Sequence, residues 1–218
     1  MKKVLFSFVI FFLFNNALLA QTYGNDGKNY RTFQVSGYEG IWMAQNLNAS
    51  EFRNGDIIPQ AKNSAEWRKA AEKKQPAWCY YNYDPTNESK YGKLYNWYAV
   101  KDSRGLAPNG WHIPTIGELE GLVAISKGSR FAGSYMKSEW GWDGYNDATN
   151  KSGFSGLPGG YCSPYGSSSD IKTDGYWWSY SEKDQLNSWY ITMNWNDSGV
   201  DISPADKKAG FSVRCKKD

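Results

Sequence analysis

The densest group of residues that could bind a ligand lies in a glycine-rich segment. Residues 140–147 read Trp-Gly-Trp-Asp-Gly-Tyr-Asn-Asp, so aromatic rings stand beside an amide and two carboxylates. Sugars stack on exposed rings and exchange hydrogen bonds with nearby polar side chains. The alternative is that the two tryptophans are core residues that hold the loop in place. The ligand-binding candidates are Trp140, Trp142, Tyr145, Asn146, Asp147 and, in a second aromatic stretch, Tyr165.

A tripeptide further along could hold a metal ion. Trp195-Asn196-Asp197 matches a tripeptide that supplies calcium oxygens in calcium-dependent lectins, and such oxygens suit a hard cation. The same stretch also has the composition of a turn between two strands. The proline motif that accompanies the tripeptide in those lectins is missing. We therefore expect no metal, with calcium at this tripeptide as the open alternative.

The sequence offers little for catalysis. Its one histidine, His112, stands just before a helix cap and is expected to be structural. Neither a zinc-ligand spacing nor a phosphate-binding glycine loop is present, and no spacing singles out a pair of carboxylates. We expect a protein that is not an enzyme, with no catalytic residue and no cofactor.

The chain begins with the pattern of an export leader. Lys2 and Lys3 precede an apolar stretch of about eleven residues, and Ala20 gives a small residue at the expected cleavage point. We expect residues 1–20 to be a signal peptide and residues 21–218 a single domain. The protein would then be exported to the periplasm, the outer-membrane surface or the medium, with no transmembrane segment after cleavage.

The net charge limits the classes of partner, and the aromatic content indicates what the core consists of. Two of the 25 Lys and Arg residues lie in the leader, which leaves 23 against 22 acidic residues, or +1. Such a balance does not favour a nucleic-acid partner. Aromatic residues make up 17% of the chain, so most of the core should consist of rings.

Three cysteines in an exported chain suggest one disulfide and one remaining thiol. Any of three pairs is possible among them. Cys215 lies in a strongly patterned final strand, and Cys79 begins a segment typical of a buried strand. The pattern favours a Cys79–Cys215 disulfide, with Cys162 free and buried.

Local signals predict strands at the start of the chain and two helices. Asn25-Asp-Gly27 is typical of a two-residue hairpin turn, with strands at 21–23 and 30–35 and a further strand at 40–44. Asn63 with Glu66 and Thr115 with Glu118 have the spacing of capping boxes. The second helix carries an apolar face of Leu119, Leu122 and Val123.

The rest of the chain reads as loops followed by a meander. Residues 126–188 lack helical periodicity and are expected to form long ordered loops with short strands. Four antiparallel strands are expected at 176–181, 188–195, 200–203 and 210–215. The second helix should pack on this meander, with Phe211 and Val213 beneath it.

Several long segments, in this order, resemble the Fibrobacter succinogenes major paralogous domain, a family of exported bacterial proteins. The similarity runs from Asp26 to Cys215, and the family's frequent cysteines correspond to Cys79 and Cys215, which agrees with the favoured pair. The segments are Trp42-Met-Ala-Gln-Asn-Leu47, Tyr80-Tyr-Asn82, Leu94-Tyr-Asn-Trp-Tyr98, Gly110-Trp-His-Ile-Pro-Thr115 and Gly210-Phe-Ser-Val-Arg-Cys215.

A more distant resemblance is to the formylglycine-generating enzyme superfamily. Residues 113–119 and 210–214 are similar to its helix start and its chain ending. The close cysteine pair that binds metal in those enzymes is missing here. Both resemblances imply an α+β, C-type-lectin-like fold: an irregular twisted antiparallel sheet, one or two helices and long ordered loops.

These observations lead to two functional hypotheses. The first is an exported, non-catalytic binding module whose partner is a surface glycan or polysaccharide. The alternative is a protein-interaction subunit of a cell-envelope or surface assembly, whose partner is an envelope protein. Fold alone does not decide between them.

Overall fold

The computed structural model describes residues 22–23, 27–144 and 147–218. The expected leader, 1–20, and two candidate binding residues, Tyr145 and Asn146, lie outside them. Within the described ranges no helix is long and apolar enough to cross a membrane. The division into a leader and one domain stays a prediction.

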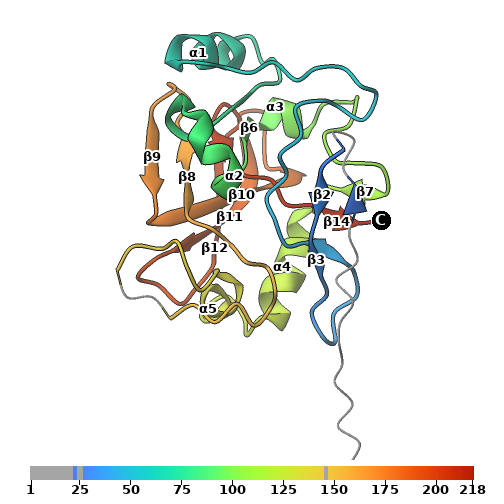
Figure 1. The fold of residues 1–218 in the computed structure, drawn as a ribbon, viewed down its shortest axis with the longest axis vertical. Coiled ribbons are helices and arrows are strands. Elements are labelled where there is room, and N and C mark those ends of the chain that lie inside the picture. Colours follow the sequence, from blue (N-terminus) through green and yellow to red (C-terminus); the bar gives the residue numbers. More distant parts are fainter. Residues whose placement is uncertain (1–21, 24–26, 145–146) are drawn as a thin grey trace, which may run out of the picture.

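The fold is a mixed α+β arrangement with mostly antiparallel sheets (Figure 1). The large sheet has the order β12-β11-β10-β8-β13-β6-β5, with β9 paired to β8. Among the named strands only β8 and β10 pair in parallel. Its strands are β5 (Trp78–Cys79), β6 (Leu94–Asn96), β8 (Gly159–Cys162), β9 (Ser168–Ile171), β10 (Asp174–Glu182), β11 (Asn187–Asn194), β12 (Asp201–Asp206) and β13 (Gly210–Phe211).

A smaller sheet joins the two ends of the described chain. Its order is β3-β4-β14-β7, and a separate pair is formed by β1 and β2. The expected pairing at the start of the chain is confirmed in part: Thr22 pairs with Tyr30 and Thr32 with Met43, but the expected strand 30–35 is divided between two sheets. Residues 24–26 of the expected two-residue turn lie outside the described ranges. These strands are β1 (Thr22–Tyr23), β2 (Asn29–Tyr30), β3 (Thr32–Phe33), β4 (Trp42–Met43), β7 (Trp111–His112) and β14 (Lys216–Lys217).

Both expected helices are present with the expected caps. The Asn63 side chain accepts the N–H of Glu66 at α1, and Thr115 and Glu118 cap each other at α4. These contacts satisfy N–H groups that have no partner inside the helix. The helices are α1 (Ser64–Glu72), α2 (Glu88–Tyr91), α3 (Trp97–Val100), α4 (Ile116–Ile125) and α5 (Ala132–Met136), with 3-10 turns at Tyr81–Tyr83 and Pro85–Asn87.

The middle region is largely loops with short strands, as expected, but it also holds the helix α5. Its short sequence has no apolar period that would reveal it. Packing holds this short helix, because Gly133 lies so close to the Gly199 carbonyl that a β-carbon would collide with that oxygen. A contact between residues this far apart in the sequence leaves no local signal.

The meander is confirmed for β10, β11 and β12, but the expected position of the last strand is wrong. Strand β13 pairs with β6 and β8 instead of β12. Gly210 permits this, because an indole carbon of Trp67 and the β-carbon of Cys162 occupy the space where a side chain would begin. The chain end therefore crosses into the middle of the large sheet.

The helix α4 packs on β10 and β11, as a helix-on-sheet arrangement requires. Leu119, Leu122 and Val123 are buried in one core cluster with Trp177 and Ile191. The expectation that Phe211 and Val213 lie beneath α4 is wrong, because both belong to a second cluster. There the Phe211 ring lies 4.3 Å from the Trp178 ring.

The expected Cys79–Cys215 disulfide is absent: all three cysteines are free and buried. Cys79 shares a small cluster with Cys162 and makes a thiol hydrogen bond with it, whereas Cys215 lies in a different cluster. Cys79 and Cys162 are far apart in the sequence, so the sequence pattern alone does not reveal their contact.

Candidate functional site

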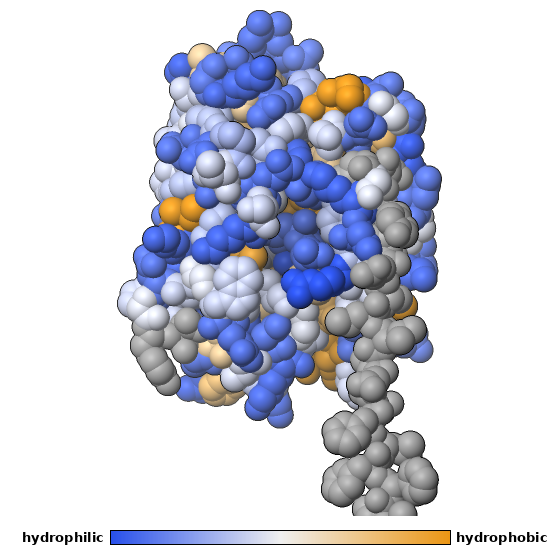
Figure 2. Space-filling model, in the orientation of Figure 1, coloured by the Kyte–Doolittle hydropathy of each residue, from blue (hydrophilic) through white to orange (hydrophobic). Residues whose placement is uncertain are grey.

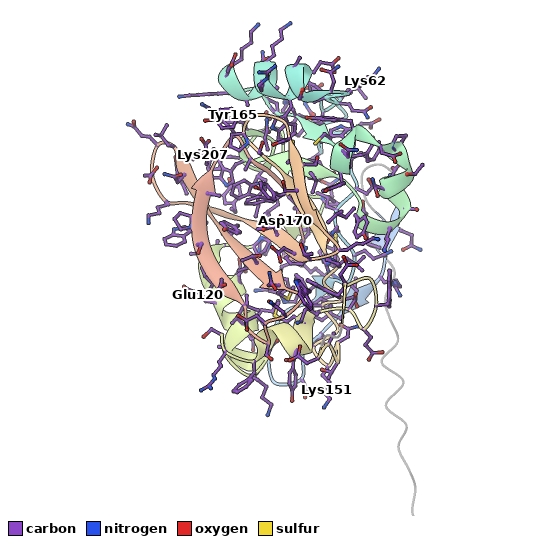
Figure 3. All side chains as sticks on the ribbon, turned by 90° about the vertical axis from the view of Figure 1, so that its left-hand side faces the viewer. Lys62, Glu120, Lys151, Tyr165, Asp170 and Lys207 are labelled. Atoms are coloured by element: carbon purple, nitrogen blue, oxygen red, sulfur yellow. The ribbon has the colours of Figure 1, made fainter. Side chains whose placement is uncertain are left out.

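The structure separates the candidate rings. Trp140 and Tyr165 are exposed, at 57% and 79%, whereas Trp142 is 7% exposed and cannot serve as a surface platform. Tyr165 lies toward the α1 end of the molecule (Figure 3). Its neighbour Gly166 packs on Ser64, so the two exposed rings belong to different parts of the surface.

Asp147 is already engaged in the structure. Its carboxylate accepts hydrogen bonds from the hydroxyls of Ser134 and Ser198 and lies 3.1 Å from the buried Lys137 ammonium. Burial by itself would raise the pKa of Asp147, but these donors outweigh it and hold the pKa at about 2. Asp147 therefore ties the 140–147 segment to α5 and to the β11–β12 turn.

Trp140 lies beside a cavity of about 330 Å³, which we call the polar cavity. Its volume is at the lower end of the range of about 300–1,000 Å³ typical of small-ligand sites. The face between α2 and the β2–β3 side is largely hydrophilic (Figure 2). The cavity is lined by Lys28, Asn29, Tyr30, Arg31, Ala44, Gln45, Asn46, Asn48, Glu88, Ser89, Lys90, Tyr91, Gly92, Ser138, Trp140, Asn150, Ser155, Leu157 and Arg214.

One wall of the polar cavity is organised by Glu88 at the start of α2. One carboxylate oxygen accepts from Lys28 at 2.9 Å and Asn48 at 3.0 Å, and the other accepts from Tyr80 at 2.8 Å. The hydrogen bond from Lys28, helped by those from Tyr80 and Asn48, lowers the pKa of Glu88 to about 2. Glu88 is therefore a fixed negative charge at neutral pH.

Lys93 stands behind this wall and is buried. Its ammonium donates to the backbone and side-chain oxygens of Asn48 at 2.9 and 2.6 Å and lies 3.3 Å from Glu88. Burial, with the charge of Lys28 beside it, lowers the pKa of Lys93 to about 8. Gly92 allows this arrangement, because it has a φ of +74° and a β-carbon there would stand 3.3 Å from the Leu47 carbonyl oxygen.

The floor of the polar cavity is formed by Asn46 and Arg214. The Asn46 amide oxygen accepts from Arg214 at 2.8 Å and from the Trp177 indole at 2.9 Å, and its amide nitrogen donates to the Tyr91 carbonyl. Arg214 also donates to the carbonyls of Met43 and Phe154. These bonds join β4, α2, β10 and the chain end beneath the cavity.

The rim carries Trp140 and a cation. The Lys90 ammonium lies 5.8 Å from the centre of the Trp140 ring and 4.8 Å from that of Tyr91. On the same side, Asn150 and Ser155 close their loop with two hydrogen bonds of 2.8 Å. The site thus combines an exposed ring, several amides and a set of charged groups.

Sequence reasoning found Trp140 but missed the rest of this site. Lys28, Arg31 and Glu88 look like ordinary surface residues in a sequence, and no spacing connects them. Asn46 and Arg214 lie in two of the segments that carry the family resemblance. Their position in those segments was the signal in the sequence that could have identified them as part of the site.

A second cavity of about 420 Å³ lies on another part of the molecule. Its titratable neighbours are engaged: His112 contacts Asp218 at 2.7 Å and Glu118 at 3.0 Å, and Asp102 holds Arg104 at 2.8 Å. His112 is thus a bridging residue, in line with its expected structural role. The cavity is lined by Arg53, Val100, Asp102, Ser103, Gly105, Leu106, Ala107, His112, Ile113, Thr115 and Tyr180.

The Trp195-Asn196-Asp197 tripeptide forms the turn after β11. The Asp197 side chain accepts the N–H of Gly199 at 2.8 Å, and its carbonyl accepts from Lys137 at 2.8 Å. Within the described ranges, no three His, Cys, Asp or Glu side chains come together as metal ligands would. The tripeptide therefore has the expected turn conformation, and calcium binding at this turn stays the open alternative.

Comparison with protein families gives one match. The profile of the Fibrobacter succinogenes major domain matches residues 39–217, most of the chain. The chain belongs to that family. A comparison with curated proteins and one with solved structures found no significant match. In this Fibrobacter succinogenes major domain, most of the polar cavity lies inside the matched region, but Lys28 to Arg31 precede it.

Proposed function

We propose that this protein is an exported, non-catalytic module that binds a surface glycan through the polar cavity and the Trp140 ring. The observation that carries the proposal is an exposed indole beside a cavity rich in amides. A sugar presents an apolar ring face together with hydroxyls that both donate and accept. The indole can stack on the apolar ring face, and the amides can exchange hydrogen bonds with the hydroxyls.

The charge pattern favours binding over hydrolysis. Glycoside hydrolases generally use two opposed carboxyl groups, one of them with a raised pKa. Glu88 is the one carboxylate among the residues that line the polar cavity, and its pKa is lowered to about 2. A group that is ionised at neutral pH and surrounded by donors is a poor general acid.

The proposal includes a C-type-lectin-like fold and export beyond the inner membrane. The packing of α4 on the antiparallel strands β10 and β11 supports the fold. The leader pattern of residues 1–20 supports export to the periplasm, the outer surface or the medium.

The second candidate function is docking of an envelope protein, and the second cavity favours it. That cavity is lined by Leu106, Ala107 and Ile113 and bordered by the exposed Tyr180 ring. Apolar surface of this kind suits a protein partner better than a sugar. The two functions therefore predict binding at different places on the molecule.

Affinity electrophoresis in gels that contain cellulose, xylan or pectin tests the proposal. We expect retention on at least one polysaccharide, and we expect Trp140→Ala to abolish it without changing the melting temperature. Tyr165→Ala removes an even more exposed ring elsewhere and is the matched control, with retention unchanged. A chelator should not weaken retention. Equal retention of Trp140→Ala and the unmodified chain would contradict the proposal.

A further inference from the structure

The polar cavity carries an excess of positive charge. Lys28, Arg31, Lys90 and Arg214 line it, against the single carboxylate of Glu88. Glu88 is already shared between Lys28 at 2.9 Å and the buried Lys93 at 3.3 Å. No negative charge on the lining remains for the other three cations.

Arg214 is the most unusual of these cations. It is fully buried, and its described partners are carbonyl and amide oxygens, not a carboxylate. Its Nε–H has no hydrogen-bond partner among the described residues. Burial, with the charge of Arg31 acting in the same direction, lowers the pKa of Arg214 to about 9. A buried cation without a counterion is costly, and an anion brought close to it recovers part of that cost.

Arg31 and Lys90 supply the accessible part of this charge. Both are exposed, and neither forms an ion pair within the described ranges. The Lys90 ammonium rests over the Tyr91 and Trp140 rings, and Arg31 is close enough to Arg214 to affect its titration. Two exposed cations thus line the same cavity as a buried one, beside an exposed indole.

We infer that the polar cavity binds an acidic sugar, with the carboxylate of a uronic acid unit against Arg31 and Lys90 and the sugar ring on Trp140. A guanidinium can hold a carboxylate through two parallel N–H···O bonds. Arg214 adds its charge from beneath, through the floor that it shares with Asn46. This inference rests on the proposed glycan binding and names the class of glycan.

Calorimetric titration of the mature chain with oligogalacturonate tests the inference. The fully methyl-esterified oligomer, which has the same sugar backbone without charge, is the matched neutral probe. A sulfated oligosaccharide such as a chondroitin sulfate fragment tests whether any anion suffices. We expect oligogalacturonate to bind at least about tenfold more tightly than its ester, because hydrogen bonds to charged groups are the stronger kind.

Single substitutions locate the effect. Arg31→Gln and Lys90→Gln should each weaken the binding of oligogalacturonate about tenfold and leave the binding of the ester nearly unchanged. Both residues are exposed, so the variants should keep the melting temperature of the unmodified chain. Arg130→Gln and Lys62→Gln, on exposed residues outside the cavity lining, are the controls and should bind as before.

The outcomes separate the two levels of the proposal. Equal affinity for the acid and its ester, with both lost in Trp140→Ala, would overturn the acidic-sugar inference but leave glycan binding standing. The acidic-sugar inference would also be overturned if the control variants weakened the binding of oligogalacturonate as much as Arg31→Gln and Lys90→Gln do. The protein would then attract the acid through its net charge alone. Tighter binding of the sulfated probe than of oligogalacturonate would overturn the carboxylate assignment. Failure of all three probes, together with failure on the neutral polysaccharides, would overturn glycan binding itself.

Discussion

Cys79 and Cys162 lie against each other in a buried cluster, beside the Tyr83 hydroxyl, which is 3.8 Å from the Cys162 sulfur. Burial, with the neighbouring thiol of Cys162, raises the pKa of Cys79 well above its usual value. Burial likewise raises the pKa of Cys215 to about 12. Cys79 and Cys215 should therefore be slow to react while the protein is folded, because the thiolate is the reactive form.

The structure predicts which pair forms when the protein refolds with oxidised glutathione. Exchange with this disulfide should join Cys79 to Cys162, because the native fold brings these two thiols together, and release reduced glutathione. Cys215 should remain available for alkylation after unfolding. Peptide mapping without reductant distinguishes the pairs, and a peptide that links Cys79 to Cys215 would contradict the structure.

Residue type alone could not show which tryptophan of the 140–147 segment is exposed and which is buried. Trp140 and Trp142 are two positions apart in the same glycine-rich segment, yet one is exposed and the other is buried. The difference arises from packing: the Lys137 ammonium lies 5.5 Å from the Trp142 ring, and Trp142 packs in the cluster that includes residues of β10 and β11, which are distant in the sequence. Such contacts are set by the whole fold.

At the scale of elements, α4 is the clearest link between pattern and packing. Its cap is local, and its apolar face meets the sheet through Leu119, Leu122 and Val123, all buried. Leu122→Ala should lower the free energy of unfolding by about 2–5 kcal/mol, because it leaves a cavity between helix and sheet. Urea denaturation measures the loss.

Ile125→Ala on the same helix is the control for that prediction. Ile125 is 41% exposed, so its truncation should change the free energy of unfolding by no more than about 0.5 kcal/mol. A similar loss for both variants would contradict the burial of Leu122 on the sheet as the cause of the effect.

Elements with local signals were predictable, and elements defined by distant contacts were not. Asn63 and Thr115 mark the starts of their helices in the sequence, because a cap depends only on residues three positions apart. Strand β13 has only two residues, and its position depends on Gly210 meeting Asn96 and Cys162. Its pattern predicted a strand but could not identify its neighbours.

At the scale of the whole molecule, partly buried ion pairs make stability depend on pH. Hydrogen bonds from Lys28 lower the pKa of Glu88 to about 2, and donors to Glu118 and Asp147 overcome their burial and lower the pKa of each to about 2. A carboxyl group with a lowered folded pKa stabilises the fold above its unfolded pKa, and this contribution is lost as the pH falls toward the folded value.

The melting temperature should therefore hold down to about pH 4.5 and fall between about pH 4 and pH 2. Scanning calorimetry across this range measures the change. The matched variant Asp147→Asn lacks one of the three groups and should show a shallower fall from a lower starting point. A melting temperature that is flat from pH 5 to pH 2 would contradict the ion pairing in the structure.

The polar cavity shows why a site of this kind is hard to read from a sequence. Its lining comes from β2, the segment after β4, α2, the middle loops and the chain end, and it spans the sequence from Lys28 to Arg214. Each residue is ordinary in its local context. The charge excess becomes visible only when Arg31, Lys90 and Arg214 are brought to one place.

The central claim is that a glycan binds in the polar cavity against Trp140, and the indole N–H signals test it most directly. A two-dimensional nitrogen–proton NMR titration would use a short oligosaccharide of whichever polysaccharide in the panel retains the protein. The Trp140 indole signal should shift on binding. The indoles of Trp97 and Trp178, which donate to buried carbonyls of Ser179 and Tyr95, should not move. An unmoved Trp140 signal, with shifts confined to the second cavity around Tyr180 or to Tyr165, would contradict the account.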